Sequence, residues 1–150
     1  MGTEPSNAAT EVAREFIQAW SDRERFLSEW DKWFAEGFVR EDRRRLIAMP
    51  DADSSAYKEE FRSLHELTGE GHPIFDYAEV IAIHGERLGC NRTFARFGSD
   101  TSMEVLSVGQ WNEDVTQIQK LVLFDADDVE AALEELDRLH LALQDDQADR

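Results

Sequence analysis

The sequence predicts an α+β domain in which helices come first, a meander of antiparallel strands follows and a helix ends the fold. Apolar residues recur at helical spacing up to residue 37, which is typical of amphipathic helices. From residue 74 to 124 the pattern is extended and broken by turns of two or three residues, so successive strands must be antiparallel neighbours. Helical spacing returns in the leucines between 129 and 143.

Two helices are expected before residue 37. The apolar face of the first consists of Val12, Phe16, Ala19 and Trp20. The run Ser21-Asp-Arg-Glu24 matches a capping box, which predicts that a second helix begins there and continues to about Glu36. Gly37 then suits a helix end in the left-handed conformation, which only glycine adopts at low cost.

A strand is expected after Gly37, because the period changes from helical to two. Phe38, Arg40 and Asp42 should then point to one side, with Val39, Glu41 and Arg43 on the other. Asp42 is either a carboxylate that projects into a pocket or one neutralised by neighbouring arginines.

The remaining elements follow from the same rules. A third helix should carry its apolar residues on one face and end at the glycines and proline of residues 69–73. Its apolar residues are Tyr57, Phe61, Leu64 and Leu67. The meander strands are expected at 75–84, 87–97, 102–111 and 115–124, and a last helix at 129–143, capped by Asp125-Ala-Asp-Asp128.

One domain accounts for the chain. At 150 residues it is large enough to bury a core of its own. We expect a disordered lead-in at residues 1–7, a single domain at 8–143 and a frayed polar tail at 144–150.

Charge and motifs exclude several classes of function. A net charge of -17 opposes binding to nucleic-acid phosphates or to an anionic membrane surface. The lone Cys90 forms no internal disulfide, and no apolar run serves as a signal or a membrane span, so a cytoplasmic protein is expected. No residue spacing matches a metal site, and no glycine-rich phosphate loop or dinucleotide fingerprint occurs, so no metal and no cofactor are expected.

Two stretches carry a resemblance to a known superfamily. They are Phe34-Ala-Glu-Gly-Phe-Val-Arg-Glu-Asp-Arg-Arg and Lys120-Leu-Val-Leu-Phe-Asp-Ala-Asp-Asp-Val-Glu-Ala-Ala-Leu. With the order of elements, they resemble the SnoaL-like and nuclear transport factor two-like superfamily, in particular an uncharacterised actinobacterial branch of it. The resemblance spans about residues 8–140 and implies a cone-shaped, cystatin-like roll. In such a roll a curved sheet wraps the N-terminal helices around an apolar pocket.

The resemblance also implies a position for catalysis. Asp42 falls where the isomerases of the superfamily hold a general base, and His84 is a weaker candidate for proton transfer. Arg40 and Arg44 are the expected electrostatic partners of Asp42. A nearby cation lowers the pKa of a carboxylate and so weakens it as a base. The two oxyanion donors of those isomerases are replaced by Phe16 and Ser107, so their mechanism does not transfer.

An apolar pocket is the other expected feature. Its candidate lining residues are Phe16, Trp20, Trp30, Phe38, Tyr77, Met103, Ser107 and Trp111. Each aromatic residue taken alone is equally typical of an ordinary core.

Two hypotheses of function follow. The first is a domain that binds an apolar small molecule without catalysis, as a ligand sensor or an accessory module, and that forms a homodimer. The alternative is a cofactor-independent cyclase, isomerase, dehydratase or epoxide hydrolase that uses Asp42 as acid or base.

Overall fold

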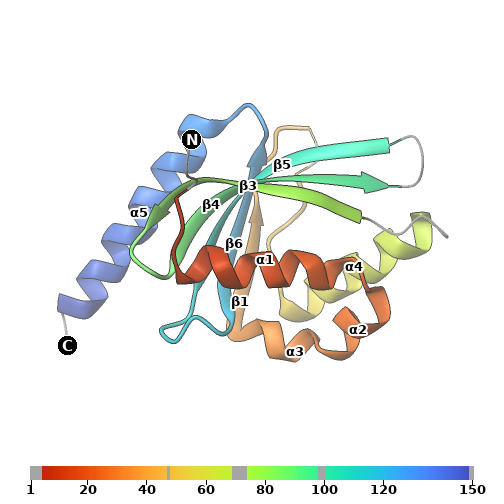
Figure 1. Ribbon diagram of the computed structural model, residues 1–150, viewed down its shortest axis with the longest axis horizontal. Coiled ribbons are helices and arrows are strands. Elements are labelled where there is room, and N and C mark those ends of the chain that lie inside the picture. The colour runs from red at the N-terminus through yellow and green to blue at the C-terminus, as the bar shows by residue number, and fades with distance from the viewer. Residues whose placement is uncertain (1–4, 47, 69–73, 98–100, 149–150) are drawn as a thin grey trace.

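The computed structural model describes residues 5–46, 48–68, 74–97 and 101–148, and within these ranges the side chains of 64–68, 74–78, 97, 101, 147 and 148 are left aside (Figure 1). The helices are α1 (Ala8–Trp20), α2 (Arg23–Ser28), α3 (Trp30–Trp33), α4 (Ser54–Thr68) and α5 (Val129–Ala148). The strands are β1 (Phe34–Asp42), β2 (Ala52–Asp53), β3 (Ile74–His84), β4 (Leu88–Phe97), β5 (Thr101–Trp111) and β6 (Ile118–Asp125).

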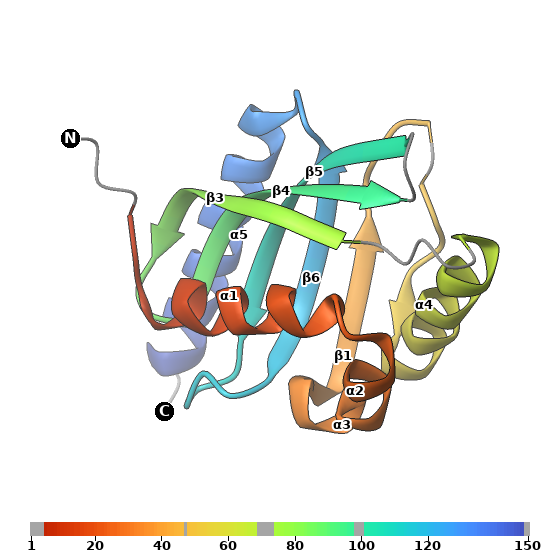
Figure 2. The ribbon, with the colours of Figure 1, turned by 45° about the vertical axis from the view of Figure 1, so that its right-hand side comes forward.

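The strands form one curved, mixed sheet in the order β2-β1-β6-β5-β4-β3. Strands β3 to β6 are the expected antiparallel meander, and β1 joins it by pairing parallel to β6. Helices α1 to α4 lie on one side, here the inner face, and α5 lies on the other, here the outer face (Figures 1 and 2). The predicted α+β fold, with N-terminal helices, a meander and a C-terminal helix, is confirmed.

The inner core contains a dense group of rings, here called the aromatic cluster. Its members are Phe16, Trp20, Phe26, Trp30, Trp33, Phe34, Phe38, Tyr57, Phe61 and Trp111. Phe16 alone meets five other rings at centroid distances of 5.5 to 5.9 Å, all edge to face. Edge-to-face pairs add to the free energy gained by burying the rings. This end of the inner face is therefore closed by packed side chains.

The outer core lies under α5. Ala132, Leu136 and Leu139 of this helix are at most 4% exposed and pack on apolar side chains of the sheet. The sheet residues are Leu88, Cys90, Leu106, Val108, Val122 and Phe124. None of the described helices is long and apolar enough to cross a membrane.

Three local predictions at the N-terminal helices were wrong. The expected second helix is divided into α2 and α3, and the chain becomes a strand at Phe34 rather than after Gly37. Gly37 has the predicted left-handed conformation (φ +82°), but it lies at an irregularity in β1 where the register with β6 shifts. The cap of α2 is Asp22, whose carboxylate accepts from the backbone N–H of Arg25, whereas Ser21 ends α1.

At both ends, regular structure extends past the predicted bounds of the elements. Asn7 is buried, caps α1 and donates to the backbone oxygens of Gly85 and Leu88, so the end of the expected lead-in is fixed to the sheet. At the other end, α5 continues to Ala148, beyond the expected end at Leu143.

Strand β6 begins at Ile118, three residues later than expected, because residues 112–117 form a loop in which Val115 has a φ of 55°.

Candidate functional site

Strand β1 presents alternate residues to the two faces of the sheet, as predicted. Phe38, Arg40 and Asp42 are buried on the inner face, whereas Val39 and Glu41 are half-buried. A buried charge is stable only when it is paired, so Arg40 and Asp42 must each have a partner of opposite charge.

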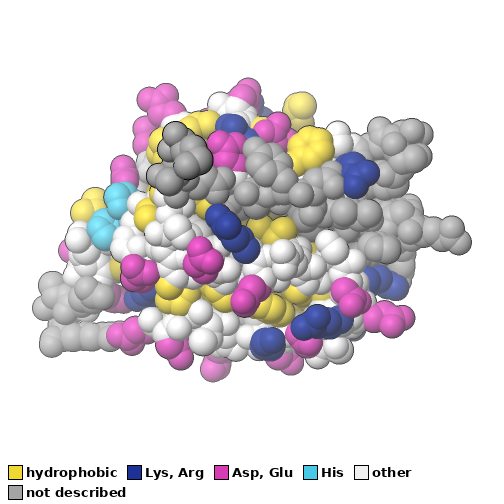
Figure 3. All heavy atoms as spheres, in the orientation of Figure 1, with side chains coloured by type: hydrophobic (Ala, Val, Ile, Leu, Met, Phe, Trp, Pro, Cys, Tyr) yellow, Lys and Arg dark blue, Asp and Glu magenta, His cyan; other side chains and the backbone are white. Residues whose placement is uncertain are grey.

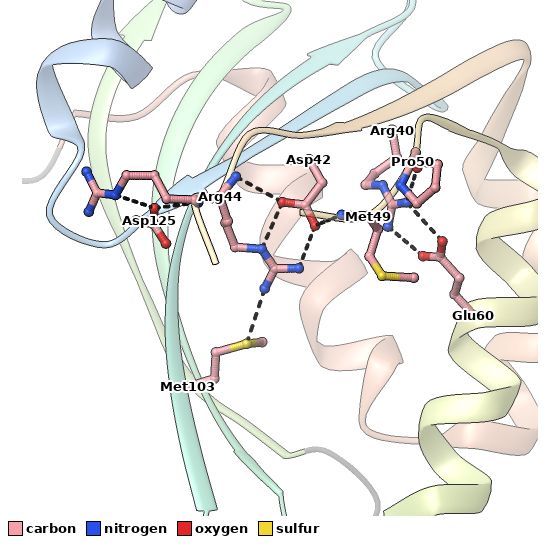
Figure 4. A network of polar contacts seen from close by, with 9 residues as sticks. Arg40, Asp42, Arg44, Met49, Pro50, Glu60, Met103 and Asp125 are labelled. Carbon is pink, nitrogen blue, oxygen red and sulfur yellow. Dashed lines mark hydrogen bonds and ion pairs between the residues drawn. The ribbon is translucent and has the colours of Figure 1, made fainter. Parts of the chain in front are cut away.

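Asp42 is held on both carboxylate oxygens (Figure 4). Arg44 donates from Nε to Oδ1 at 2.9 Å and from Nη2 to Oδ2 at 2.7 Å. Backbone N–H groups of Arg44 and Met49 donate to the same two oxygens, each at 3.1 Å. Burial by itself would raise the pKa of Asp42, but the hydrogen bonds from Arg44 and Met49 outweigh it, so the pKa lies below its ordinary value.

Arg44 donates to Asp42 from two of its three guanidinium nitrogens. The hydrogen bond with Asp42 outweighs burial and raises the pKa of Arg44, so the guanidinium is always charged. Its Nη1 faces the sulfur of Met103 on β5 at 3.5 Å, and a thioether is a weak acceptor (Figure 4). The side chain of Arg44 is 14% exposed, whereas that of Asp42 is 0% exposed. Arg44 therefore retains a donor edge that a stronger acceptor could use.

Arg40, the other expected partner of Asp42, binds elsewhere. Its two terminal nitrogens contact both carboxylate oxygens of Glu60 on α4, at 2.5 and 2.9 Å, and Nη2 also donates to the backbone oxygen of Pro50. The guanidinium lies 5.2 Å from the ring centre of Tyr57. Asp42–Arg44 and Arg40–Glu60 are thus two separate ion pairs, and each is close to electrically neutral.

The register of the sheet aligns Asp42 with polar residues on other strands. Asp42 and Ser107 are both paired with Leu123 of β6, and Asn91 of β4 is paired with Ser107. Directly paired residues share one face of a sheet, so Asp42, Ser107 and Asn91 form a row across the inner face, here called the polar row. Ser107, Asn91, Leu123 and the nearby Met103 are only half-buried. This part of the inner face therefore retains contact with solvent.

The expected pocket residues divide between the two ends of the inner face. Phe16, Trp30, Phe38 and Trp111 are buried and Trp20 is half-buried, all within the aromatic cluster. Met103 and Ser107 lie near the Asp42–Arg44 pair. The side chain of Tyr77 lies outside the described part, although its backbone pairs with Phe94. For all eight residues, contact with a ligand stays a prediction.

His84 lies on the outer side of the sheet. Its ring stacks on that of His140 of α5 at 4.5 Å, and its Nε2 is 2.5 Å from an oxygen of Asp137. Its strand partner Leu88 belongs to the outer core. These contacts favour a link between β3 and α5 over the predicted role in proton transfer beside Asp42. The sequence has two further histidines before His84, and the side chains of both, His65 and His72, lie outside the described part of the chain.

Cys90 and the described cavity also belong to the outer side. Burial raises the pKa of the Cys90 thiol to about 11, which fits a packing role. The cavity has a volume of about 340 Å³ and is open to solvent. It is lined by Arg43, Phe124, Asp128, Ala131, Glu134, Glu135 and Arg138. Buried Glu135 is already bound by Arg43 and Arg138, so the groove contains a satisfied ion-pair network.

Sequence reasoning missed Asn91. The alternation of β4 could not be assigned to a face, because one bulge reverses it. Cys90 in the outer core would have settled the assignment, since its neighbour Asn91 must then face inward. Among the described residues, no group of three or more His, Cys, Asp or Glu side chains is placed to hold a metal ion.

Comparisons with known proteins identify the fold. No family model matches the chain, and no curated protein matches it in sequence. Among solved structures, AusH from Aspergillus nidulans is similar with a TM-score of 0.63 and 16% identity, over 81% of this chain and 86% of AusH. A protein of the SnoaL-like family from Agrobacterium tumefaciens is similar with a TM-score of 0.58 and 15% identity, over 78% of this chain and 96% of that one.

A third similar structure is an NTF2-like protein of unknown function from Cytophaga hutchinsonii, with a TM-score of 0.55 and 11% identity, over 81% of this chain and 92% of that one. The chain therefore has the fold of these NTF2-like and SnoaL-like proteins, which is the fold that the resemblance implied. Identities this low show the fold alone, and the function has to be argued from the site.

Proposed function

We propose that this chain is a small-molecule-binding domain without catalytic activity, with its site at the open end of the inner face. The observation that carries the proposal is the asymmetry of the Asp42–Arg44 pair. Both oxygens of Asp42 accept hydrogen bonds, whereas Nη1 of Arg44 faces only a thioether among the described residues. In this proposal Arg44 binds the ligand and Asp42 holds Arg44 in position.

Charge selects the kind of ligand group that Arg44 would bind. Asp42 already balances the charge of Arg44, so a second carboxylate there would meet repulsion from Asp42. The net charge of -17 also opposes an anion. A neutral acceptor such as a ketone or ester carbonyl gains a charge-assisted hydrogen bond without that cost. Apolar neighbours such as Val105 and Leu123 suit a hydrocarbon body.

The same geometry disfavours Asp42 as a general base. A base must have a free lone pair near the substrate and a pKa close to the working pH. Four donated hydrogen bonds occupy the carboxylate of Asp42, and they lower its pKa. An enzyme that used Asp42 would first have to break this arrangement.

The proposal is tested by calorimetric titration with methyl decanoate, a neutral ester with an apolar chain. Asp42→Asn/Arg44→Gln replaces the ion pair by two amides, which avoids leaving one buried charge unpaired. We expect the wild type to bind the ester and the double variant to bind at least about tenfold more weakly, because a charge-assisted hydrogen bond is lost.

Arg45→Gln is the matched control, since Arg45 is exposed and pairs with Asp125 and Asp127 on the surface. Its affinity should equal that of the wild type. Absence of binding to the wild type, or equal binding by the double variant, would refute the proposal. Turnover of an ester by the wild type that is lost in Asp42→Asn would instead support the catalytic alternative.

A homodimer and a cytoplasmic location stay predictions. Helix α5 covers the outer face along β4 to β6, which restricts a dimer formed through the sheet itself. Figure 3 shows acidic side chains spread over the visible face around a narrow band of hydrophobic ones. The exposed large hydrophobic residues of the described part are Leu46, Met49 and Leu141. Light scattering after size-exclusion chromatography would measure the subunit number.

A further inference from the structure

Asn91 places a polar side chain on the inner face of the sheet. The oxygen of its side chain is fully buried and accepts no hydrogen bond from the described residues. A buried polar atom without a partner destabilises the folded state, and native structures seldom retain one without a reason. An apolar residue of similar size would avoid the cost. The side chain is therefore expected to have a partner that is not part of the chain.

Its neighbours define what that partner can be. Ser107 is paired with Asn91 on the adjacent strand and supplies a hydroxyl on the same face. The side chains of Val80 and Thr93, on the same face, are 6% exposed. No charged side chain belongs to this pair. A ligand hydroxyl fits, because it can both donate to the amide oxygen and accept from a serine hydroxyl.

The start of α1 packs on the position of β4 that is two residues before Asn91. A Cβ added to Gly89 would lie 3.0 Å from Cγ2 of Thr10, so α1 rests directly on that glycine. Gly89 precedes Asn91 by two residues and faces the same side of the sheet. Asn91 thus lies next to the closed part of the inner face, on the side toward the half-buried Ser107 and Met103.

We propose that Asn91 and Ser107 form a second polar contact of the ligand site, one that binds a hydroxyl group. This inference rests on the proposed function, in which Arg44 binds a carbonyl at the other end. Met103 and Ser107 are four residues apart on β5, and Asn91 is one strand further, so its backbone is about 14 Å from that of Met103. The ligand class is an elongated neutral molecule with an apolar body, a carbonyl near one end and a hydroxyl near the other.

The test compares two esters that differ only in this hydroxyl, methyl decanoate and methyl ω-hydroxydecanoate, by calorimetric titration. We expect the wild type to bind the hydroxy ester on the order of fivefold more tightly, which corresponds to one neutral hydrogen bond. Asn91→Leu should remove this preference, so that the two esters bind the variant with the same affinity. Its thermal unfolding temperature should not fall, since the unpaired oxygen is gone.

Ser107→Ala should reduce the preference, whereas Ser102→Ala, the same change at an exposed position on the other face of β5, should leave it intact. Equal binding of both esters by the wild type would refute the role of Asn91 and retain the site at Arg44. An equal loss of affinity for both esters in Asn91→Leu would refute it as well. If neither ester bound the wild type, the proposed function itself would fail.

Discussion

The two ends of the inner face use the same sheet for opposite purposes. At the closed end, the aromatic cluster fills the space between the helices and the sheet, with Trp30 1% and Phe26 0% exposed. At the open end, Asn91, Met103 and Ser107 are only half-buried. There Nη1 of Arg44 faces a thioether, and the side-chain oxygen of Asn91 accepts no hydrogen bond from the described residues. The comparison shows that dense packing stabilises the domain at one end, whereas the other end is the place where we propose that a ligand binds.

The largest effect should come from the closed end. Trp30 stacks on Phe34 at 4.2 Å and donates from its indole nitrogen to the hydroxyl of Ser54. Trp30→Ala should therefore lower the free energy of unfolding by about 3 to 5 kcal/mol, measured by urea denaturation. A loss below about 1 kcal/mol would mean that the cluster is not the structural centre of the domain.

A smaller effect on stability is expected at the Asp42–Arg44 pair of the open end. Asp42→Asn leaves Arg44 charged and partly buried without its anion, and it weakens the contact with Met49. The free energy of unfolding should fall by about 2 kcal/mol, because only one of the two partners is fully buried. An unchanged melting temperature would show that the ion pair does not stabilise the domain, and it would contradict the structural role of Asp42.

The Asp42–Arg44 pair should also make the stability of the domain depend on pH. The folded-state pKa of Asp42 lies below its ordinary value, as do those of Glu41 and Glu135. The unfolded chain therefore binds more protons in this range, and stability falls as the pH decreases below about 5. The melting temperature should decrease less steeply between pH 5 and 3 in Asp42→Asn than in the wild type. Parallel profiles would assign the acid sensitivity to other carboxylates.

The smallest effect on stability is expected from substitutions that enlarge a side chain on the inner face. Ser107→Val at the half-buried open end should change the free energy of unfolding by less than about 1 kcal/mol. Gly89→Ala should cost more, because its Cβ would lie 3.0 Å from Thr10. Thermal unfolding of both variants measures the difference. A larger loss for Ser107→Val would contradict the open end.

Much of this fold could be predicted from the sequence, because periodicity and short turns are local signals. The alternation in β1 correctly placed Arg40 and Asp42 on the same side of the strand. The division of the second helix was missed, since Trp30, Trp33 and Phe34 keep helical spacing across the point where the chain becomes a strand. In that segment, packing in the aromatic cluster overrides the local pattern.

The site was less predictable than the fold. Arg44 lies two residues from Asp42, so their pairing was expected from proximity, but Arg40 is equally close and binds Glu60 instead. The choice depends on where α4 places Glu60, which is a tertiary contact. The face on which Asn91 lies depends on the strand register, and the register of β4 with β3 shifts at irregular positions. No local sequence pattern specifies that register.

The position of α5 has a practical consequence. This helix lies on the outer face, and its last turns project away from the body of the sheet (Figure 1). A fluorescent reporter attached after its end would thus be separated by the whole thickness of the sheet from Arg44 and Asn91. Such a fusion should report on chain stability or on assembly in living cells without obstructing access to the inner face.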